Sequence, residues 1–222
     1  MKWIKRLCSF LILAIVILCG VLCVKGYIDY REALDNKSVE QMAEEIESID
    51  NYTTIDELPQ DYINAVLAVE DKRFYSHPGV DPAATCRALI NDIKAGSYVE
   101  GGSTITQQLA KNQYFTQDKK LVRKAAEMFM AFKIESVLDK DKIFELYVNS
   151  IFFGNGYYCV ADASWGYFGK APSEMDFDEC TLLAGIPNAP TNYNPAASPE
   201  LARERQAQVI EKMKKAGYIS EE

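Results

Sequence analysis

The chain has 222 residues, of which 48% are hydrophobic, and this length suits one domain with accessory segments. The formal net charge of −8 argues against nucleic acid as a partner, because a nucleic-acid-binding surface needs an excess of basic residues. A single histidine, His77, rules out a multi-histidine metal site, and the cysteines lack the C-x-x-C spacing of a zinc site.

An uncharged apolar run lies near the N-terminus, from Leu7 to Val24. In helical form these 18 residues span about 27 Å, which is enough to cross a hydrocarbon core. Three basic residues precede the run and one follows it, which favours a cytoplasmic N-terminus and an extracellular remainder. The alternative is a cleaved signal peptide, but the run is long for one and no A-x-A-like site follows it. We therefore expect a cytoplasmic tail at residues 1–6 and a single-pass anchor in the cell membrane at residues 7–24.

The polar segment that follows, residues 25–54, is predicted to be a membrane-proximal stalk. Four of its apolar residues recur at helical spacing, namely Val39, Met42, Ala43 and Ile46. This spacing predicts a short amphipathic helix within the stalk.

A buried helix is predicted to end near Glu70. Apolar residues precede this position at helical spacing, namely Ile63, Val66 and Leu67. A carboxylate among apolar neighbours, at the negative end of a helix dipole, is well suited to act as a general base. The alternative is an ordinary ion pair of Glu70 with Lys72 or Arg73.

The stretch from Gly101 to Asn112 is polar and begins with two glycines, unlike a core helix or strand. Its hydroxyls, side-chain amides and single lysine suit a polyhydroxylated or phosphorylated ligand. The alternative is a loop followed by a helix that Ser103 or Thr104 caps. On such a helix, Gln107 and Lys111 share one face.

A second carboxylate, Glu127, lies one turn after Arg123 on a helix predicted for residues 121–138. The alternative for this pair is a surface i, i+4 ion pair worth a few tenths of a kcal/mol. The apolar segment around Tyr147 is predicted to be core, and a terminal helix over residues 201–215 carries Arg205. Helical periods dominate the whole chain, so the sequence predicts an all-α domain.

Five stretches, in this order, resemble the five motifs of the peptidoglycan glycosyltransferases of family 51. They are Glu70-Asp71-x-x-Phe74-x-x-His77-x-Gly79-x-Asp81, then Gly101 to Asn112, then Arg123-Lys124-x-x-Glu127, then Glu145-Leu146-Tyr147-Val148-Asn149 with Gly154, and finally Arg205, Val209, Ile210 and Met213. The resemblance covers about residues 55–219. It implies a lysozyme-like glycosyltransferase domain at residues 55–222 with a small membrane-proximal lobe.

The family includes monofunctional transglycosylases and the glycosyltransferase domain of class A penicillin-binding proteins. No Ser-x-x-Lys occurs in the chain, so we expect the monofunctional kind. The chain departs from the family pattern at three positions. Lys119 stands where arginine is frequent, Cys159 stands at a glycine position, and Glu204 stands where many members have a second arginine.

The resemblance implies that lipid II is polymerised into β-1,4-linked glycan, with inversion and release of undecaprenyl diphosphate. Glu70 is then the base that takes the proton of the attacking hydroxyl. Glu127 lies on the donor side, near the diphosphate, where it holds either a basic residue or a divalent metal ion (Mg or Mn). No other cofactor is implied. The implied partners are lipid II, the lipid-linked glycan chain, the membrane and other cell-wall synthesis proteins.

The resemblance also implies two further sets of residues. The substrate-binding set is Asp71, Phe74, Ser103, Thr104, Gln107, Gln108, Lys111, Asn112, Lys119, Arg123, Lys124 and Arg205. The set that braces the cleft is His77, Gly102, Glu145 and Asn149.

Two other functions remain open at this point. One is a glycan-cleaving enzyme of the same fold, a lysozyme or lytic transglycosylase, which would use a protonated glutamate as its acid. The basic residues around Glu127 argue against it, because cleavage of a sugar–sugar bond leaves no diphosphate to hold. The other is a non-catalytic anchored scaffold, and the presence of both Glu70 and Glu127 argues against that.

Overall fold

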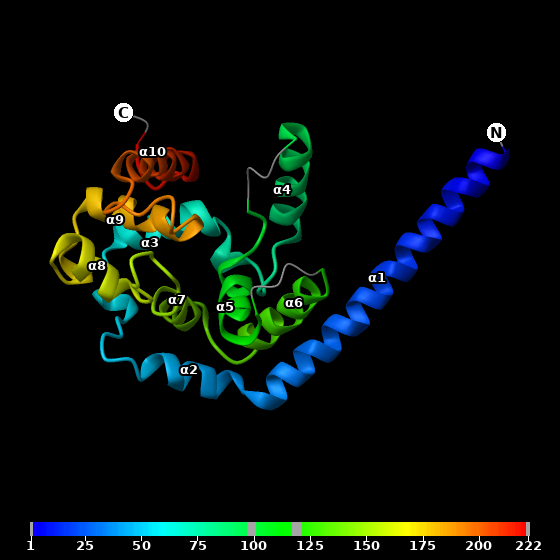
Figure 1. Cartoon of the computed structure of the whole chain (residues 1–222), viewed down its shortest axis with the longest axis horizontal. Coiled ribbons are helices and arrows are strands. Elements are labelled where there is room, and N and C mark those ends of the chain that lie inside the picture. Colours follow the sequence, from blue (N-terminus) through cyan, green and yellow to red (C-terminus); the bar gives the residue numbers. More distant parts are fainter. Residues whose placement is uncertain (1, 97–100, 117–120, 221–222) are drawn as a thin grey trace.

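The structure is a computed structural model that describes residues 2–96, 101–116 and 121–220, and within these ranges every regular element is a helix (Figure 1). The α-helices are α1 (Lys2–Asn36), α2 (Val39–Glu47), α3 (Gln60–Glu70), α4 (Pro82–Ala95), α5 (Ile105–Tyr114), α6 (Leu121–Glu135), α7 (Lys140–Val148), α8 (Val160–Phe168), α9 (Phe177–Gly185) and α10 (Pro199–Ala216). Single 3-10 turns are η1 (Ile55–Glu57), η2 (Phe74–Ser76), η3 (Pro172–Glu174) and η4 (Ile186–Asn188). The prediction of an all-α fold is confirmed.

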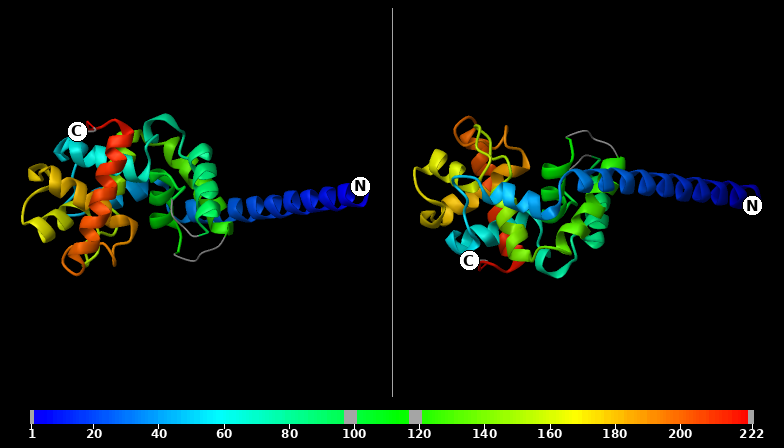
Figure 2. Two further views of the ribbon diagram at one scale, coloured as in Figure 1. Left: turned by 90° about the horizontal axis from the view of Figure 1, so that it is seen from above. Right: turned by 90° about the horizontal axis from the view of Figure 1, so that it is seen from below.

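The first helix, α1, is continuous, and its N-terminal part projects away from the other helices in every view (Figures 1 and 2). It contains the predicted apolar run, and by length and composition it can cross a membrane. Its C-terminal part packs on α6 at Gly26, where an added Cβ would lie 2.5 Å from the Cβ of Ala125. The rings of Tyr27 and Tyr30 add to this contact by packing against Phe129. The apolar helix is therefore fixed directly to α6.

The short amphipathic helix predicted after the apolar run is α2, and it is confirmed. The hydroxyl of Ser38 caps it by accepting a hydrogen bond from the backbone of Gln41, and the Gln41 side chain accepts from the backbone of Ser38. The four predicted apolar residues of α2 are all buried in the main core. Residues 39–47 thus belong to the packed domain, while the predicted boundaries of the stalk, 25–54, remain predictions.

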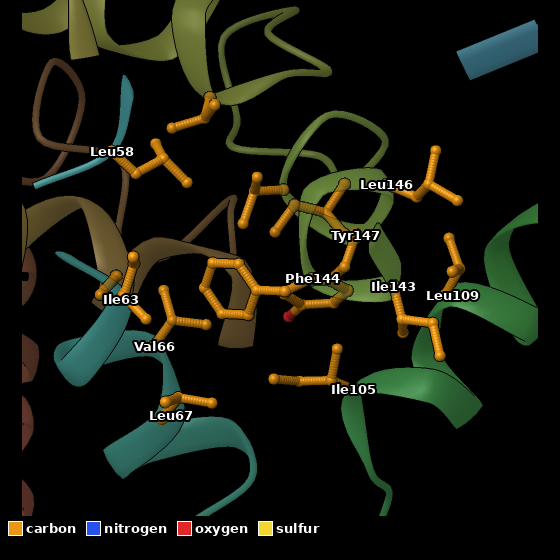
Figure 3. Packing of buried hydrophobic residues seen from close by; sticks show 14 of the residues in the cluster. Leu58, Ile63, Val66, Leu67, Ile105, Leu109, Ile143, Phe144, Leu146 and Tyr147 are labelled. Atoms are coloured by element: carbon orange, nitrogen blue, oxygen red, sulfur yellow. The ribbon is translucent and has the colours of Figure 1, made fainter. Parts of the chain in front are cut away.

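The centre of the core is α7, which packs against α5, α2 and α6. Phe144 and Tyr147 are fully buried there, and Figure 3 shows them between Val66 of α3 and Ile105 of α5. Complete burial of an apolar side chain of this size contributes about 1.5–3 kcal/mol relative to exposure. The prediction that the segment around Tyr147 is core is confirmed, except that Phe152 is partly exposed.

Helix ends place the polar residues of the motifs at the surface of this core. Glu70 is the last residue of α3, because Asp71 leaves the helical conformation with φ −156° and ψ 78°. Thr104 is the N-cap of α5, so the predicted choice between Ser103 and Thr104 is settled in favour of Thr104. The helix predicted to reach residue 138 ends at Glu135, since the chain turns there and Asp139 caps the start of α7.

Candidate active site

A cleft of about 810 Å³ opens between α3, α5, α6 and α10. Residues from four of the five predicted motifs line it, namely Glu70, Ser103, Gln107, Gln108, Lys111, Arg123, Lys124, Glu127 and Arg205. The fold thus brings together residues that are widely separated in the sequence. The cleft combines two carboxylates with five cations, and both kinds of group face the same space.

Glu70 lies at the end of α3, and its carboxylate faces the start of α5. Nε2 of Gln108 donates a hydrogen bond to Oε2 of Glu70 at 2.6 Å. The amide nitrogen can only donate, so the carboxylate oxygen accepts in this contact. The hydrogen bond therefore holds one oxygen of Glu70 in place at the edge of the cleft.

Glu127 is 1% exposed and lies between two cations. Its Oε1 is 2.8 Å from Nε of Arg123, and its Oε2 is 3.0 Å from Nζ of Lys124. Lys124 also donates a hydrogen bond of 2.7 Å to the hydroxyl of Ser103. The i, i+4 contact between Arg123 and Glu127 exists, but it is a buried ion pair within the cleft and not a pair on the open surface.

Lys111 is the cation of α5 that lines the cleft, one turn after Gln107. Burial lowers the pKa of its amine below the usual value. Glu127 opposes this shift, while Arg123 and Lys124 add to it because they are like charges. An ammonium in these surroundings is stabilised when an anion enters the cleft.

Arg205 of α10 is 7% exposed, and its guanidinium lines the cleft from the opposite side. It donates to Oε1 of Gln208 at 3.0 Å and to the carbonyl of Gly185 at 3.4 Å. An added Cβ at Gly185 would lie 3.0 Å from Cγ of Arg205, so only a glycine leaves room for this side chain without movement. The ring of Tyr193 lies beside the guanidinium, 5.7 Å from it.

A second cavity, of about 490 Å³, adjoins the cleft. The two cavities share Glu70, Gly101 and Ser103, together with Val69 and Lys212. Basic side chains also line the second cavity, namely Lys72, Arg73, Arg87 and Lys215. Glu70 therefore faces two adjoining spaces, each with cations in its wall.

Comparison with known proteins agrees with this arrangement. The sequence model of a family described as Transglycosylase matches residues 35–214. The chain belongs to the transglycosylase family. This match confirms the family resemblance of the five motifs.

Three relatives of this transglycosylase illustrate the match. Penicillin-binding protein 1A of Aquifex aeolicus is 48% identical, over 77% of this chain and 24% of that protein. Penicillin-binding protein 1F of Bacillus subtilis is 39% identical, over 98% of this chain and 33% of that protein. A protein of Cupriavidus necator, provisionally named a transglycosylase, is 42% identical over 77% of this chain and 73% of that protein. The chain thus spans between a quarter and a third of the two penicillin-binding proteins.

The first motif of the transglycosylase holds its own loop together. Nε2 of His77 lies 2.9 Å from Oδ2 of Asp71, and Nδ1 of His77 accepts from the backbone of Gly79. Nε2 therefore carries the proton and donates to the carboxylate. Asp71 also accepts from the backbone of Ile105, and the hydroxyl of Thr104 donates to the carbonyl of Gly79. These contacts tie the loop after Glu70 to the start of α5.

Several predicted site residues lie away from the cleft. Phe74 is 1% exposed and packs against Phe144 in the core, and Asn112 does not line the cleft. Asp71, Gly102 and Thr104 line the second cavity instead. Lys119 lies outside the described residues. The bracing role of Gly102 and the substrate-binding roles of the other residues remain predictions.

The two predicted bracing residues of α7 hold residues 52–55 against that helix. Glu145 accepts hydrogen bonds from the hydroxyl of Tyr52 and the backbone of Ile55. The side-chain amide of Asn149 pairs with both backbone groups of Thr53. These contacts fix the chain just before α3, and an effect on the cleft itself remains a prediction.

Four polar residues of the cleft wall were absent from the prediction: Asn188, Tyr193, Gln208 and Lys212. Gln208 and Lys212 follow Arg205 by three and seven positions on α10, so helical spacing would have found them. Asn188 and Tyr193 belong to the irregular segment after α9, which carries only turn signals in the sequence. No local pattern marks them as part of the cleft.

Glu127 is paired with basic residues in this structure, and the predicted divalent metal ion at the donor diphosphate remains a prediction. Each of its carboxylate oxygens already lies within 3.0 Å of a cationic nitrogen, from Arg123 or Lys124. Among the described residues, no group of three histidine, cysteine or acidic side chains could hold a metal ion. The donor set matches the other predicted possibility, in which Glu127 holds basic residues.

Proposed function

We propose that this transglycosylase polymerises lipid II into β-1,4-linked glycan strands and releases undecaprenyl diphosphate, with inversion at the anomeric carbon. One observation supports this proposal above the others: a single cleft joins the carboxylate of Glu70 to five cations. A sugar hydroxyl is a poor nucleophile and needs a base, whereas a diphosphate leaving group needs positive charge rather than a proton. The cleft offers both.

The proposed step begins at the 4-hydroxyl of the acceptor sugar. Its oxygen forms a bond to the anomeric carbon of the donor, and its proton passes to the carboxylate of Glu70. The bond between that carbon and the diphosphate oxygen breaks, and the electron pair leaves with the diphosphate. The cations of Lys111, Arg123, Lys124 and Arg205 stabilise the negative charge that develops there.

The two adjoining cavities suit two substrates. The cation cluster of the larger cleft favours the donor and its diphosphate, so the smaller cavity is left for the acceptor. Glu70 lines both cavities and therefore stands where the acceptor hydroxyl would meet the donor. Gln108 holds the carboxylate toward this junction.

The apolar helix α1 fits substrates that are themselves lipids. We propose that it spans the cell membrane, with residues 1–6 in the cytoplasm and the cleft on the outer side. Because α1 packs directly on α6, the anchor holds Glu127 and its cations at a fixed distance from the membrane.

The test uses the purified full chain in detergent micelles, supplied with lipid II. Wild-type protein is expected to form glycan polymer and to release one undecaprenyl diphosphate for each bond made. Glu70→Gln is expected to abolish both products, and Glu204→Gln, which alters an exposed carboxylate of α10, is the matched control. Release of fragments from finished glycan, with lipid II left intact, would show a glycan-cleaving enzyme instead. A wild-type protein that forms no product from either substrate would be a non-catalytic scaffold, and equal turnover by wild type and Glu70→Gln would overturn the role of Glu70 as the base.

A further inference from the structure

A third cavity, of about 470 Å³, lies outside the two described above, where α1 meets the end of α5 and the start of α6. Its wall contains Lys25, Ile28 and Asp29 of α1, Phe115 at the end of α5, and Val122 and Arg123 of α6. The lining is mixed, with charged side chains beside apolar ones. Neither the family match nor the proposed reaction assigns this cavity a ligand.

The position of the cavity along α1 indicates which part of the membrane it faces. Lys25 is the first charged residue after the uncharged run of residues 7–24. If α1 spans the membrane, as proposed above, the hydrocarbon core ends at this point of the helix. The phosphate groups of glycerophospholipids lie at the same level, so the cavity opens among lipid headgroups. This step rests on the membrane anchoring and not on the glycosyl transfer.

The charges of the cavity match one phosphodiester. Among the described residues of the wall, Lys25 and Arg123 are cations and Asp29 is an anion, which leaves one net positive charge. A phosphodiester carries one negative charge. Nε of Arg123 forms an ion pair with Glu127, and Nη1 donates a hydrogen bond to the carbonyl of Thr116. A guanidinium has five donors, so others remain for a phosphate oxygen.

The apolar part of the wall suits the rest of a lipid molecule. Ile28, Phe115 and Val122 can contact the glycerol and the first methylene groups of an acyl chain. The fold also fixes the two helices of the wall against each other, because α1 packs closely on α6 at Gly26. A wall that is already in place needs little ordering when a ligand binds.

We propose that this cavity binds the headgroup of a membrane glycerophospholipid, with Lys25 and Arg123 on its phosphate. Arg123 lines both this cavity and the catalytic cleft. A bound phospholipid therefore lies directly behind the cation cluster at Glu127, and it fixes the junction of anchor and domain at the membrane surface.

The test measures lipid binding by native mass spectrometry of the full chain in detergent micelles. The probes are phosphatidylglycerol and a diacylglycerol with the same acyl chains, which lacks the phosphate. Wild-type protein is expected to retain one phosphatidylglycerol and at least tenfold less diacylglycerol. Lys25→Glu is expected to weaken phosphatidylglycerol binding at least tenfold. The matched control, Arg31→Gln, removes another exposed cation of α1, one that pairs with Asp35, and is expected to bind as wild type does.

A second variant separates the cavity from general charge effects. Ile28 is 56% exposed, so Ile28→Trp can fill the cavity without crowding the core, and it is expected to reduce phosphatidylglycerol binding as well. Equal binding of both lipids, or equal loss in Lys25→Glu and Arg31→Gln, would overturn the proposal. So would displacement of phosphatidylglycerol by equimolar undecaprenyl phosphate, which would assign the cavity to the isoprenoid. The assay contains no lipid II, so its result is independent of the proposed polymerisation.

Discussion

Gln108 donates a hydrogen bond of 2.6 Å to Glu70, and this contact joins the second motif to the first across the edge of the cleft. Gln108→Leu keeps most of the side-chain volume and removes the donor. Hydrogen bonds to charged groups contribute about 1.5–3 kcal/mol, so kcat is expected to fall by about 10- to 100-fold. The measurement is the initial rate of lipid II consumption at saturating substrate. An unchanged kcat would mean that the carboxylate is held by other groups during the reaction.

The neighbouring Gln107 provides a comparison, because its side chain serves a different purpose. Its Oε1 accepts from the backbone of Thr104, and its backbone donates to the hydroxyl of Thr104. Gln107→Ala is therefore expected to cost about 1 kcal/mol of stability through the helix cap. Its effect on kcat is expected to be smaller than that of Gln108→Leu or Glu70→Gln. The opposite order of kcat values, measured in the same assay, would give Gln107 a direct part in the reaction.

The difference between these two glutamines marks the limit of sequence-based prediction here. The sequence identifies the stretch, but its helix phase depends on whether Ser103 or Thr104 is the cap. The cap is Thr104, because its hydroxyl also donates to the carbonyl of Gly79 in a distant part of the chain. Long-range contacts at the start of α5, from Thr104 to Gly79 and from Ile105 to Asp71, thus help to place Gln108 beside Glu70.

Local patterns were sufficient where burial follows the helix period. The apolar residues of α2 were predicted to lie on a helix and the segment around Tyr147 in α7 was predicted to be core, and both sets are buried as expected. Local patterns were insufficient for Tyr193, because it lies in the irregular segment after α9 and contacts Arg205 only through the tertiary fold. At Cys159 the sequence departs from the family pattern without a change that the backbone resists. It replaces a family glycine, but its φ of −140° suits any residue, and its Sγ accepts from the backbone of Asp162 as the N-cap of α8.

The lowered pKa of Lys111 leads to a pH prediction. Burial disfavours the charged amine, so Lys111 loses its proton at a lower pH than an exposed lysine, whose pKa is about 10.4. If the cation holds the diphosphate, kcat/KM falls as pH rises through the lowered pKa. Lys111→Arg keeps a charge at every accessible pH and is expected to move this alkaline limb to higher pH. A pH profile of kcat/KM for both proteins is the measurement, and identical alkaline limbs would contradict the assignment.

The same lowered pKa sets a direction for stability. Between the lowered folded-state pKa of Lys111 and about 10.4, the unfolded chain binds more protons at this site than the folded protein does. Burial of the charged amine of Lys111 therefore destabilises the folded protein at pH values below its lowered pKa. This destabilisation decreases as pH rises from that pKa to about 10.4. Lys111→Met is expected to remove this rise. Denaturant titrations of both proteins across the alkaline range measure it, and parallel pH dependences would contradict the prediction.

Because Glu127 forms ion pairs with two cations, Glu127→Gln is expected to lower both stability and activity. Glu127 is almost fully buried, and the substitution leaves Arg123 and Lys124 close together without their shared anion. A loss of about 1.5–3 kcal/mol is expected, which lowers the melting temperature by about 5 °C. Glu135→Gln, at the end of the same helix and paired with Lys140, is the matched control, and it is expected to destabilise without the same loss of turnover. Equal loss of turnover in the two variants would reduce Glu127 to a structural residue.

The last prediction concerns the contact between the apolar helix α1 and α6 at Gly26. An added Cβ at Gly26 would lie 2.5 Å from the Cβ of Ala125 and 2.9 Å from the backbone nitrogen of Ala126, so Gly26→Leu must push α1 away from α6. Overpacking of this kind costs about 1–3 kcal/mol. Gly20→Leu is the matched control, because nothing lies within 4 Å of a Cβ added there.

Both variants keep the apolar run, so both are expected to fractionate with membranes. Lipid II turnover is expected to fall at least tenfold in Gly26→Leu and to stay near the wild-type rate in Gly20→Leu. The reason is that α6 carries Arg123, Lys124 and Glu127, and displacement of α1 removes the contact that positions this helix against the membrane. Full turnover by Gly26→Leu in membranes would show that the anchor is only a tether. The distance between the cleft and the bilayer would then be set by other parts of the domain.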